Sequence, residues 1–321
     1  MTGATSTRHW ARHAERGNLR LMRLTAWGLR LIGRRGLRPI VYLIVLYFFA
    51  FSAAARANIR EYQQRLTGWN EHAALQPGWR SVFAQFMAFG DSLLDKLDAW
   101  QGRLRWDTVT VDDPHGLAAQ MQSGRGQILI GAHLGNLEVC RALAERGGQC
   151  RLNVLVHTRH AEQFNRVLRR LDPGSTVRLL QVTEVDAATA VMLAGRVDAG
   201  EFVAIAADRI PVSASKTARV SFLGHPAHFP VGAYVLAALL RCPVFMMGCV
   251  RETTGHVVRF EPLAEQILLP RGRRDEALAA LAARFAAWTE TLLVRAPYDW
   301  FNFFSFWAPV PAPAEPRHTS A

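Results

Sequence analysis

The spacing of hydrophobic and polar positions changes along the chain and divides it near residue 106. Before this point apolar residues recur mainly at helical spacing, and after it short apolar runs alternate with helical segments. Residues 106–308 are therefore predicted to form an α/β domain with a mixed, mostly parallel central sheet covered by helices. Residues 1–105 are predicted to be a helical, membrane-associated region, and residues 309–321 a disordered tail rich in proline, alanine and charge.

Individual elements of the α/β domain follow from the same pattern. Strands are predicted at residues 108–111, 127–132, 151–157, 202–207, 243–251 and 256–262. Helices are predicted at residues 138–146, 161–171, 185–197, 231–241 and 273–295. Because parallel strands end at one edge of a sheet, polar residues that follow different strands are expected to meet there.

The first helical segment, residues 16–35, is basic on one side. When it is projected as a helix, one narrow arc holds Arg16, Arg20, Arg23, Arg30 and Arg34, and the opposite side holds Leu21, Met22, Leu29 and Ile32. With Trp10 and Trp27 nearby, this pattern is typical of an interfacial helix on anionic lipid. The alternative is a surface helix packed on the domain.

The next segment, Ile40–Ala55, has no charged residue and is rich in tyrosine, phenylalanine and leucine. As a helix its 16 residues extend about 24 Å, less than the hydrocarbon core of about 30 Å. Both flanks are basic, whereas a clean single crossing needs asymmetric charge. We therefore expect a helix embedded in one leaflet or a weak anchor, not a cleaved signal peptide, with the rest of the chain cytoplasmic. The aromatic residues of the helical region 57–105 form either an acyl groove or part of the core.

Charge and cysteine content narrow the classes of partner. The net charge is +12, and Lys96 and Lys216 are the only lysines. This surplus suits an anionic partner such as nucleic acid, an acidic membrane or an acidic carrier protein, although genome composition is an alternative reason for the preference for arginine. The four cysteines lack metal-ligand spacing, which predicts small buried thiols in a reducing compartment and no zinc site. No cofactor is expected.

His133 is the first candidate for chemistry. It follows the apolar run at 127–132, and Gly135 and Asn136 mark a turn before the helix that contains Glu138. This places His133 at the carboxyl end of a strand, with Glu138 close enough to reach back to the imidazole and orient it as a general base. Since no serine or cysteine lies in this segment, the histidine is expected to activate a hydroxyl of the substrate.

A second polar block follows another predicted strand. Asp208 and Arg209 come directly after the strand at 202–207, so both strand ends are expected to share one cleft. A segment with the glycine and proline content of a rigid loop comes later and contains Arg219, Gly224 and Pro226. Arginine suits a phosphate or an acidic carrier. Taken alone, Asp208 and Arg209 also fit a structural salt bridge.

Together these blocks resemble the bacterial lipid A late acyltransferases, within the lysophospholipid and glycerolipid acyltransferase superfamily. The resemblance rests on His-x4-Glu at 133–138, Asp-Arg-x-Pro at 208–211, Phe-Leu-Gly-x-Pro-Ala at 222–227 and the aromatic end at 297–307. It also includes Glu-Arg-Gly-Asn at 15–18 and the aromatic run at 47–52, and so covers nearly the whole chain. His-x4-Glu alone is weakly specific, but the ordered set is strong.

The resemblance implies transfer of an acyl chain from acyl-carrier protein or acyl-CoA to a hydroxyl of a membrane lipid or glycolipid. It implies a location on the cytoplasmic face of the inner membrane. Carried over by position, His133 is the base and Glu138 its orienting partner. Asn136, Asp208, Arg209, Arg219, Gly224 and Pro226 are the expected substrate-binding residues. No acyl-enzyme is required, and backbone N–H groups at Gly135–Asn136 or an arginine would hold the oxyanion.

Two departures from the family pattern leave the acceptor open. The region 178–186 has little basic character beyond Arg178, and the end Trp-Phe-Asn-Phe-Phe replaces a basic ending. Positive charge is therefore missing where a bis-phosphorylated sugar lipid would need it, which admits a less phosphorylated lipid or an acceptor in a pigment or polyene pathway. A hydrolase is disfavoured because the sequence has no Gly-x-Ser-x-Gly elbow. A membrane-docked scaffold remains an alternative, and nucleic acid is not an expected partner.

Overall fold

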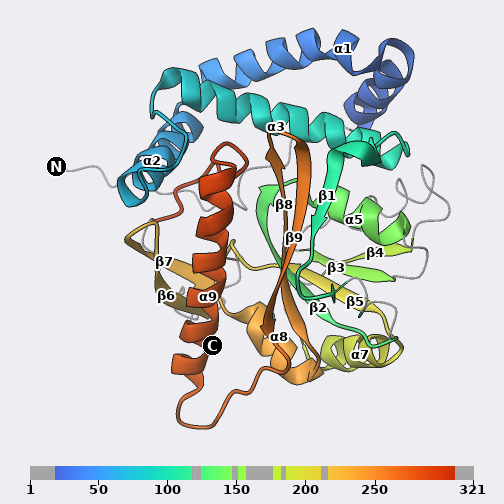
Figure 1. The fold of residues 1–321 in the computed structure, drawn as a ribbon, viewed down its shortest axis with the longest axis vertical. Helices are drawn as coiled ribbons and strands as arrows, with labels where there is room; N and C mark the ends of the chain where they lie inside the picture. The colour runs from blue at the N-terminus through green and yellow to red at the C-terminus, as the bar shows by residue number, and fades with distance from the viewer. Residues whose placement is uncertain are drawn as a thin grey trace, which may run out of the picture.

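The computed structural model describes residues 19–117, 120, 124–146, 151–156, 176–181, 186–210 and 216–307. Within this part the chain folds around one large sheet covered on both faces by helices (Figure 1). The predicted helix at 161–171 and the predicted tail at 309–321 lie outside the described residues.

The central sheet has seven strands among the described residues, in the order β1-β9-β8-β2-β5-β3-β4. They are β1 (Val109–Asp112), β2 (Ile128–Gly135), β3 (Leu152–Val156), β4 (Val177–Gln181), β5 (Phe202–Ala206), β8 (Val244–Glu252) and β9 (Gly255–Ala264). Only the β8–β9 pair is antiparallel, and the other paired strands are parallel. The predicted mixed, mostly parallel sheet is confirmed, although β4 was not predicted, because its short run of mixed polar and apolar residues lies at an edge.

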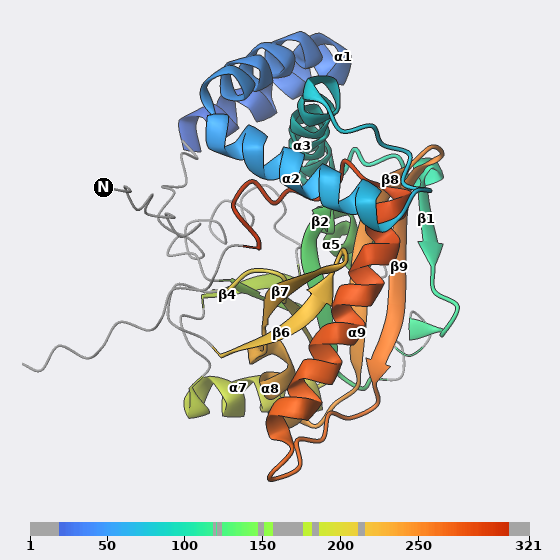
Figure 2. The ribbon, with the colours of Figure 1, turned by 90° about the vertical axis from the view of Figure 1, so that its left-hand side faces the viewer.

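Helices cover the two faces of the sheet in separate groups. The described helices are α1 (Leu19–Phe51), α2 (Ala53–Trp69), α3 (Trp79–Trp100), α5 (Leu137–Arg146), α7 (Ala187–Asp198), α8 (Gly232–Leu240) and α9 (Arg274–Arg295). Side chains of α2, α7, α8 and α9 join the core on one face, and those of α1, α3 and α5 join the core on the other. Figure 2 shows α9 along one face of the sheet, with α1, α2 and α3 gathered above it.

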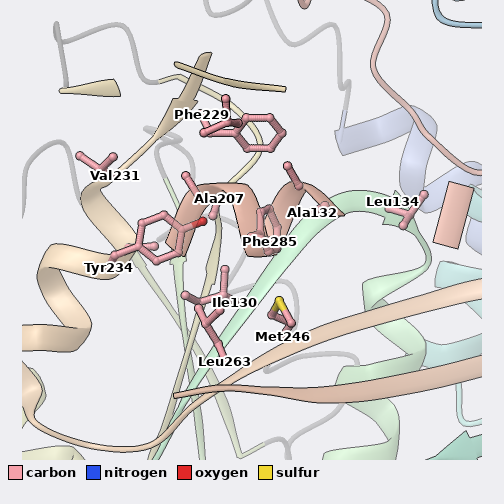
Figure 3. Close-up of a cluster of buried hydrophobic side chains, with 14 of the residues drawn as sticks. Ile130, Ala132, Leu134, Ala207, Phe229, Val231, Tyr234, Met246, Leu263 and Phe285 are labelled. Atoms are coloured by element: carbon pink, nitrogen blue, oxygen red, sulfur yellow. The ribbon is translucent and has the colours of Figure 1, made fainter. Parts of the chain in front are cut away.

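Alternation along β2 links these two cores. Ile130, Ala132 and Leu134 are buried in the core that contains Phe285 of α9 (Figure 3). Leu129 points to the other face, into the core of α3 and α5. A strand buried on both faces is apolar throughout, as the run at 127–132 predicted, and full burial of each large apolar side chain stabilises the fold by about 1.5–3 kcal/mol.

One described helix, α9, is long and apolar enough to cross a membrane. It packs on the sheet, however, and 44% of its most apolar window is buried. Phe285 and Leu292 on its inner side are fully enclosed by protein. Within the described part of the chain, α9 is therefore a core helix of the α/β domain.

The N-terminal helices bend sharply. The axis of Gly36–Phe51, the second half of α1, makes an angle of 91° with α2. This half packs so closely against α3 that only glycine fits at position 90. A Cβ added at Gly90 would lie 2.9 Å from the Val41 side chain and 3.0 Å from the Val45 side chain. The single helix that the sequence predicted over Ile40–Ala55 is therefore interrupted: α1 ends at Phe51, and α2 begins at Ala53 after the bend.

The segment predicted as a rigid loop is a β-hairpin. Its strands are β6 (Thr217–Phe222) and β7 (His225–Pro230), which pair antiparallel as a separate two-stranded sheet. The turn has positive φ at Leu223 (51°) and Gly224 (74°), as a two-residue hairpin turn requires. The loop prediction was wrong because alternate residues of β6 and β7 are buried against the core, which the proline-rich composition did not reveal.

Candidate functional site

The strand that carries His133 bulges beside it. In β2, Gly131 lies opposite Met247 of β8, and Gly135 lies opposite Cys249, so four residue steps on β2 face two on β8. A bulge redirects side chains relative to a regular ladder. His133 lies within this irregular stretch, close to the carboxyl end of β2, as the sequence predicted.

Asp208 lies directly against His133. The Asp208 Oδ1 accepts a hydrogen bond of 2.7 Å from the Nδ1 of His133, and its Oδ2 accepts one of 2.8 Å from the His133 backbone N–H. The two residues meet because β5 is the neighbour of β2, and the chain continues past β5 with the Ala207 N–H bonded to the Gly131 carbonyl. The two predicted strand ends therefore meet in one site.

The environment of this pair keeps Asp208 ionised. Its side chain is 3% exposed, and burial by itself raises the pKa of a carboxyl group. The adjacent His133 and the positive charge of Arg209 outweigh burial and lower the pKa of Asp208 below its usual value. A carboxylate on Nδ1 places the ring proton there and leaves the Nε2 of a neutral imidazole free to accept a proton. The His133 side chain is 37% exposed, so a substrate can reach it.

Glu138, the predicted partner of His133, contacts other residues. Its Oε1 lies 3.1 Å from the Nζ of Lys96 on α3, and its Oε2 accepts a hydrogen bond of 2.7 Å from the Nε of Arg141. Glu138 is in the first turn of α5, where these two cations neutralise it, whereas Asp208 occupies Nδ1 of His133. The predicted contact is thus replaced by an ion pair that joins α5 to α3, and Asp208 takes the place assigned to Glu138.

The turn after His133 uses its backbone donors internally. The Gly135 N–H bonds to the Asp299 carbonyl at 2.7 Å, and the Asn136 N–H bonds to the Cys249 carbonyl at 2.8 Å. These N–H groups, or an arginine, were predicted to hold the oxyanion, and the two contacts leave neither N–H group free for that role. Gly135 has φ of 62°, and an added Cβ would lie 1.7 Å from the Cys249 carbonyl oxygen, so only glycine fits.

Asn136 is the N-cap of α5. Its Oδ1 accepts a hydrogen bond of 3.1 Å from the Glu138 N–H, an arrangement that stabilises the start of a helix by about 1 kcal/mol. The residue is 5% exposed, and its Nδ2 has no hydrogen-bond partner within the described part of the chain. This amide is therefore a buried donor that the described protein groups leave unused.

A cavity of about 360 Å³ borders this turn. It lies between α3 and the carboxyl edge of the sheet, and its lining includes Met87, Asp91, Asp95, Gly135, Asn136, Arg251, His256, Asp299 and Phe301. Inside it, Arg251 and His256 both pair with Asp95. The cavity therefore combines an apolar wall with charged groups that pair with one another, and neither His133 nor Asp208 is among its lining residues.

The C-terminal aromatic segment, residues 297–307, completes the site. It runs beside the bulged end of β2, where the Phe301 N–H donates to the His133 carbonyl at 3.1 Å. The Gly135 N–H donates in the opposite direction, to the Asp299 carbonyl. This segment is part of the family resemblance, but its pairing with the strand that carries His133 was not predicted. A backbone contact between residues more than 150 positions apart produces no local pattern in the sequence.

Side chains of the N-terminal helices hold the aromatic segment in place. Three side chains donate hydrogen bonds of 2.7–3.0 Å to backbone carbonyls of the segment. Asn58 bonds to the Phe303 carbonyl, Tyr62 bonds to the Pro297 carbonyl, and Gln85 bonds to the Trp300 carbonyl. Trp300 is 1% exposed, and its ring packs edge-on against Tyr62 at 4.8 Å. The helical region is thus tied to the candidate site by specific contacts.

Arg209 also binds the aromatic segment. Its Nη2 donates to the Phe301 carbonyl at 2.9 Å, and its guanidinium lies 5.5 Å from the centre of the Phe304 ring. Burial lowers the pKa of Arg209, and the neighbouring Asp208 opposes this shift. The contacts point to a clamp on the segment, whereas the sequence predicted a group that binds substrate.

The remaining predicted residues lie on the hairpin. Arg219 is exposed on β6, and Gly224 and Pro226 are exposed at the turn and the start of β7. The turn is fixed from α9, where the Oε1 of Glu290 accepts a hydrogen bond of 2.6 Å from the Leu223 N–H. In this structure the three residues form part of the hairpin surface, with no contact to His133 recorded among the described residues.

Among the described residues, no group of three or more His, Cys, Asp or Glu side chains is arranged to hold a metal ion. Cys140, Cys242 and Cys249 are buried free thiols, and Cys150 lies outside the described residues.

Comparison with known proteins bears on the whole described chain. The family model described as bacterial lipid A biosynthesis acyltransferase matches residues 24–308. None of the curated proteins compared with the chain matches it. The family match spans the helical region, the sheet, the His133 site and the aromatic segment together.

Proposed function

Because the chain belongs to the bacterial lipid A biosynthesis acyltransferase family, we propose that it transfers a fatty-acyl chain from a thioester to a hydroxyl of a membrane lipid or glycolipid. The donor in this proposal is acyl-carrier protein, with acyl-CoA as the simpler equivalent. The observation that carries the chemistry is the His133–Asp208 pair, a partly exposed imidazole with a buried carboxylate on Nδ1.

In the proposed reaction, His133 is the general base. Its Nε2 takes the proton of the acceptor hydroxyl as the oxygen attacks the thioester carbonyl, and Asp208 stabilises the imidazolium that forms. The tetrahedral intermediate then expels the thiolate, which receives the proton from His133. An oxygen ester forms, a thioester breaks, and no acyl-enzyme is needed. Glu138 supports this chemistry indirectly, since its pair with Lys96 of α3 holds α5 against α3, while its pair with Arg141 lies within α5.

The oxyanion needs a donor other than the backbone of the turn. We assign this role to the Asn136 side chain, whose Nδ2 is buried and unpartnered within the described residues while its Oδ1 caps α5. A preorganised donor in a site shielded from water stabilises developing negative charge far better than one in solvent. The assignment retains Asn136 as a substrate-binding residue through its side chain.

The outer surface of α1 supports attachment to a membrane. A broad stripe of this helix exposes large apolar side chains to solvent: Ile40, Tyr42, Leu43, Ile44, Leu46, Tyr47, Phe48 and Phe51. The remaining narrow side, with Val41, Val45 and Phe49 at helical spacing, packs against the rest of the protein. An exposed apolar stripe beside a 91° bend is suited to a helix lying in one leaflet. We propose that the catalytic domain is held in this way on the cytoplasmic face of the inner membrane.

Vesicle flotation tests the membrane proposal. We expect the wild-type protein to float with vesicles that contain anionic phosphatidylglycerol, and less with phosphatidylcholine alone, because arginine-rich segments favour anionic lipid. Replacing Leu43, Tyr47 and Phe51 with serine should abolish flotation. Replacing the exposed Val191 and Leu239 of the α/β domain is the matched control and should not. Equal flotation of both variants would reject the stripe as the docking surface.

A less phosphorylated acceptor than lipid A is the second candidate. Two arginines near the turn are already bound to protein groups: Arg209 to the Phe301 carbonyl and Arg251 to Asp95. Neither therefore supports a role as a free phosphate ligand. Lipid mass spectrometry on a deletion strain, compared with the same strain carrying His133→Ala, identifies the acceptor. The species that lacks one acyl chain in both strains names the acceptor and the chain.

The decisive experiment for catalysis uses purified protein with an acyl thioester and extracted lipid. We expect His133→Ala to lower turnover by about 10²–10⁴-fold, the usual contribution of general-base catalysis, with normal folding and membrane binding. His72→Ala changes an exposed histidine and is the control. Near-normal transfer by His133→Ala would reject the assignment, and a wild-type protein that binds lipid but transfers nothing would favour a membrane-docked scaffold.

A further inference from the structure

Asp299 lies where the bulged end of β2 separates from β8. Its backbone carbonyl accepts the Gly135 N–H of β2 at 2.7 Å, and its Oδ2 accepts the Arg251 N–H of β8 at 2.6 Å. One residue of the aromatic segment therefore bonds to both strands at the point where their own register shifts. Asp299 is 8% exposed, so water does not compete strongly for these bonds.

This junction is adjacent to the catalytic turn. Gly135 is two residues after His133, and the same segment also bonds to the His133 carbonyl through Phe301. Because β2 is bulged between Gly131 and Gly135, β8 does not supply the regular ladder that would otherwise fix this stretch. The backbone around His133 is thus held by the aromatic segment as well as by Asp208 and by the bond from the Asn136 N–H to β8.

On the basis of the proposed function, we propose that Asp299 is a positioning residue for the acyl transfer. It adds a second link between the turn after His133 and β8, beside the bond from the Asn136 N–H to the Cys249 carbonyl. It touches neither substrate nor the reacting atoms. Its carboxylate is part of a cluster that connects the turn to α3 and to the first residues of β9, since Asp95 pairs with both Arg251 and His256.

The charge of Asp299 matters for the strength of this junction. Burial raises the pKa of Asp299 to about 6, opposed by the Arg251 N–H and by the charges of Arg251 and His256. An ionised carboxylate accepts a hydrogen bond roughly twice as strongly as a neutral one. The titratable or charged groups around it are Asp95 of α3, Arg251 and Cys249 of β8, His256 of β9 and Tyr62 of α2. The junction is therefore expected to weaken as the pH falls through about 6.

The test compares Asp299→Ala with the isosteric Asp299→Asn, which keeps an acceptor for the Arg251 N–H but cannot ionise. We expect Asp299→Ala to lower kcat by about 10- to 100-fold, the usual range for a slightly misplaced catalytic group, with KM for donor and acceptor within about twofold. Asp299→Asn should recover most of that loss near pH 8. Asp107→Ala, which removes an exposed carboxylate paired with Arg105, is the control.

A pH profile separates positioning from a purely structural role. The ratio of wild-type kcat to Asp299→Asn kcat should be a few-fold at pH 8 and fall towards one below about pH 6, where the Asp299 carboxyl group becomes neutral like the amide. A ratio that does not change with pH, or unchanged kcat in Asp299→Ala, would overturn the proposal. The comparison of wild type with Asp299→Asn can be made even if Asp299→Ala is unstable.

Hydrogen–deuterium exchange gives a readout that does not depend on catalysis. Peptides that cover residues 131–137 should exchange faster in Asp299→Ala than in the wild-type protein, because the segment that accepts the Gly135 N–H loses its side-chain bond to the Arg251 N–H of β8. The same peptides should be unchanged in Asp107→Ala. Unchanged exchange in Asp299→Ala would reject the positioning role, whereas faster exchange in a protein without acyl transfer would reject only the proposed function.

Discussion

Two carboxylates lie near His133 in sequence or in space, and their surroundings differ. Glu138 is five residues away along the chain, at the start of α5, and is bound by Lys96 and Arg141. Asp208 is 75 residues away, at the end of β5, and binds both the ring and the backbone of His133. The difference shows that a neighbouring parallel strand can supply the partner of a strand-end histidine more directly than the helix that follows it.

The largest expected effect comes from removing Asp208. Asp208→Asn should lower kcat by about 10⁴-fold, since a neutral amide on Nδ1 favours the wrong tautomer of the imidazole. Asp208→Ala should be as severe and also less stable, because the His133 N–H loses its acceptor. Turnover by the purified variants measures the effect. Activity within tenfold of wild type in Asp208→Asn would return the orienting role to another group.

Asn136 is expected to have the next largest effect. Asn136→Asp keeps the oxygen that caps α5 but loses the Nδ2 donor, so kcat should fall by about 10²-fold at nearly unchanged stability. Asn136→Ala loses both the cap and the donor. It should also lose about 1 kcal/mol of unfolding free energy and therefore unfold at a lower temperature. Paired kinetic and thermal measurements distinguish the two roles. If Asn136→Asp were as active as wild type, the oxyanion assignment would fail.

Glu138 provides the contrast with Asp208. We expect Glu138→Gln to keep kcat within about threefold and to lose about 2 kcal/mol of unfolding free energy, since Lys96 and Arg141 lose a charged partner. Urea denaturation and kinetics on one preparation give both values. A loss of activity as large as that of Asp208→Asn, with unchanged stability, would restore Glu138 as the catalytic partner.

The smallest effect concerns the pH dependence of stability. The pKa of Asp208 is lower in the folded protein than its ordinary value of about 3.9, so its ionised form stabilises the fold above that value. This contribution is lost as the pH falls through the lowered pKa. The stability difference between wild type and Asp208→Asn should therefore be constant above about pH 5 and shrink below about pH 4. Urea midpoints between pH 3 and 7 measure it, and a difference independent of pH would contradict it.

Local patterns accounted for much of the fold. Apolar runs and helical spacing predicted all but one of the described strands of the central seven-stranded sheet, together with α5, α7, α8 and α9. They failed at β4, a short edge strand, and at the β6–β7 hairpin, where proline and glycine suggested a loop. In both cases pairing with a distant or adjacent strand, rather than composition, decided the conformation, as is usual for sheet residues.

The sequence by itself determined that His133 ends a buried strand, that Asp208 follows another, and that the ordered blocks belong to one enzyme family. These features depend on residues close together in the chain. Only the tertiary structure decided that β5 is the neighbour of β2, so that Asp208 and not Glu138 binds the imidazole. It alone placed Asp299 across the bulge of β2, because strand order and long-range backbone pairing arise from the packing of the whole core and leave no periodic signal in the sequence.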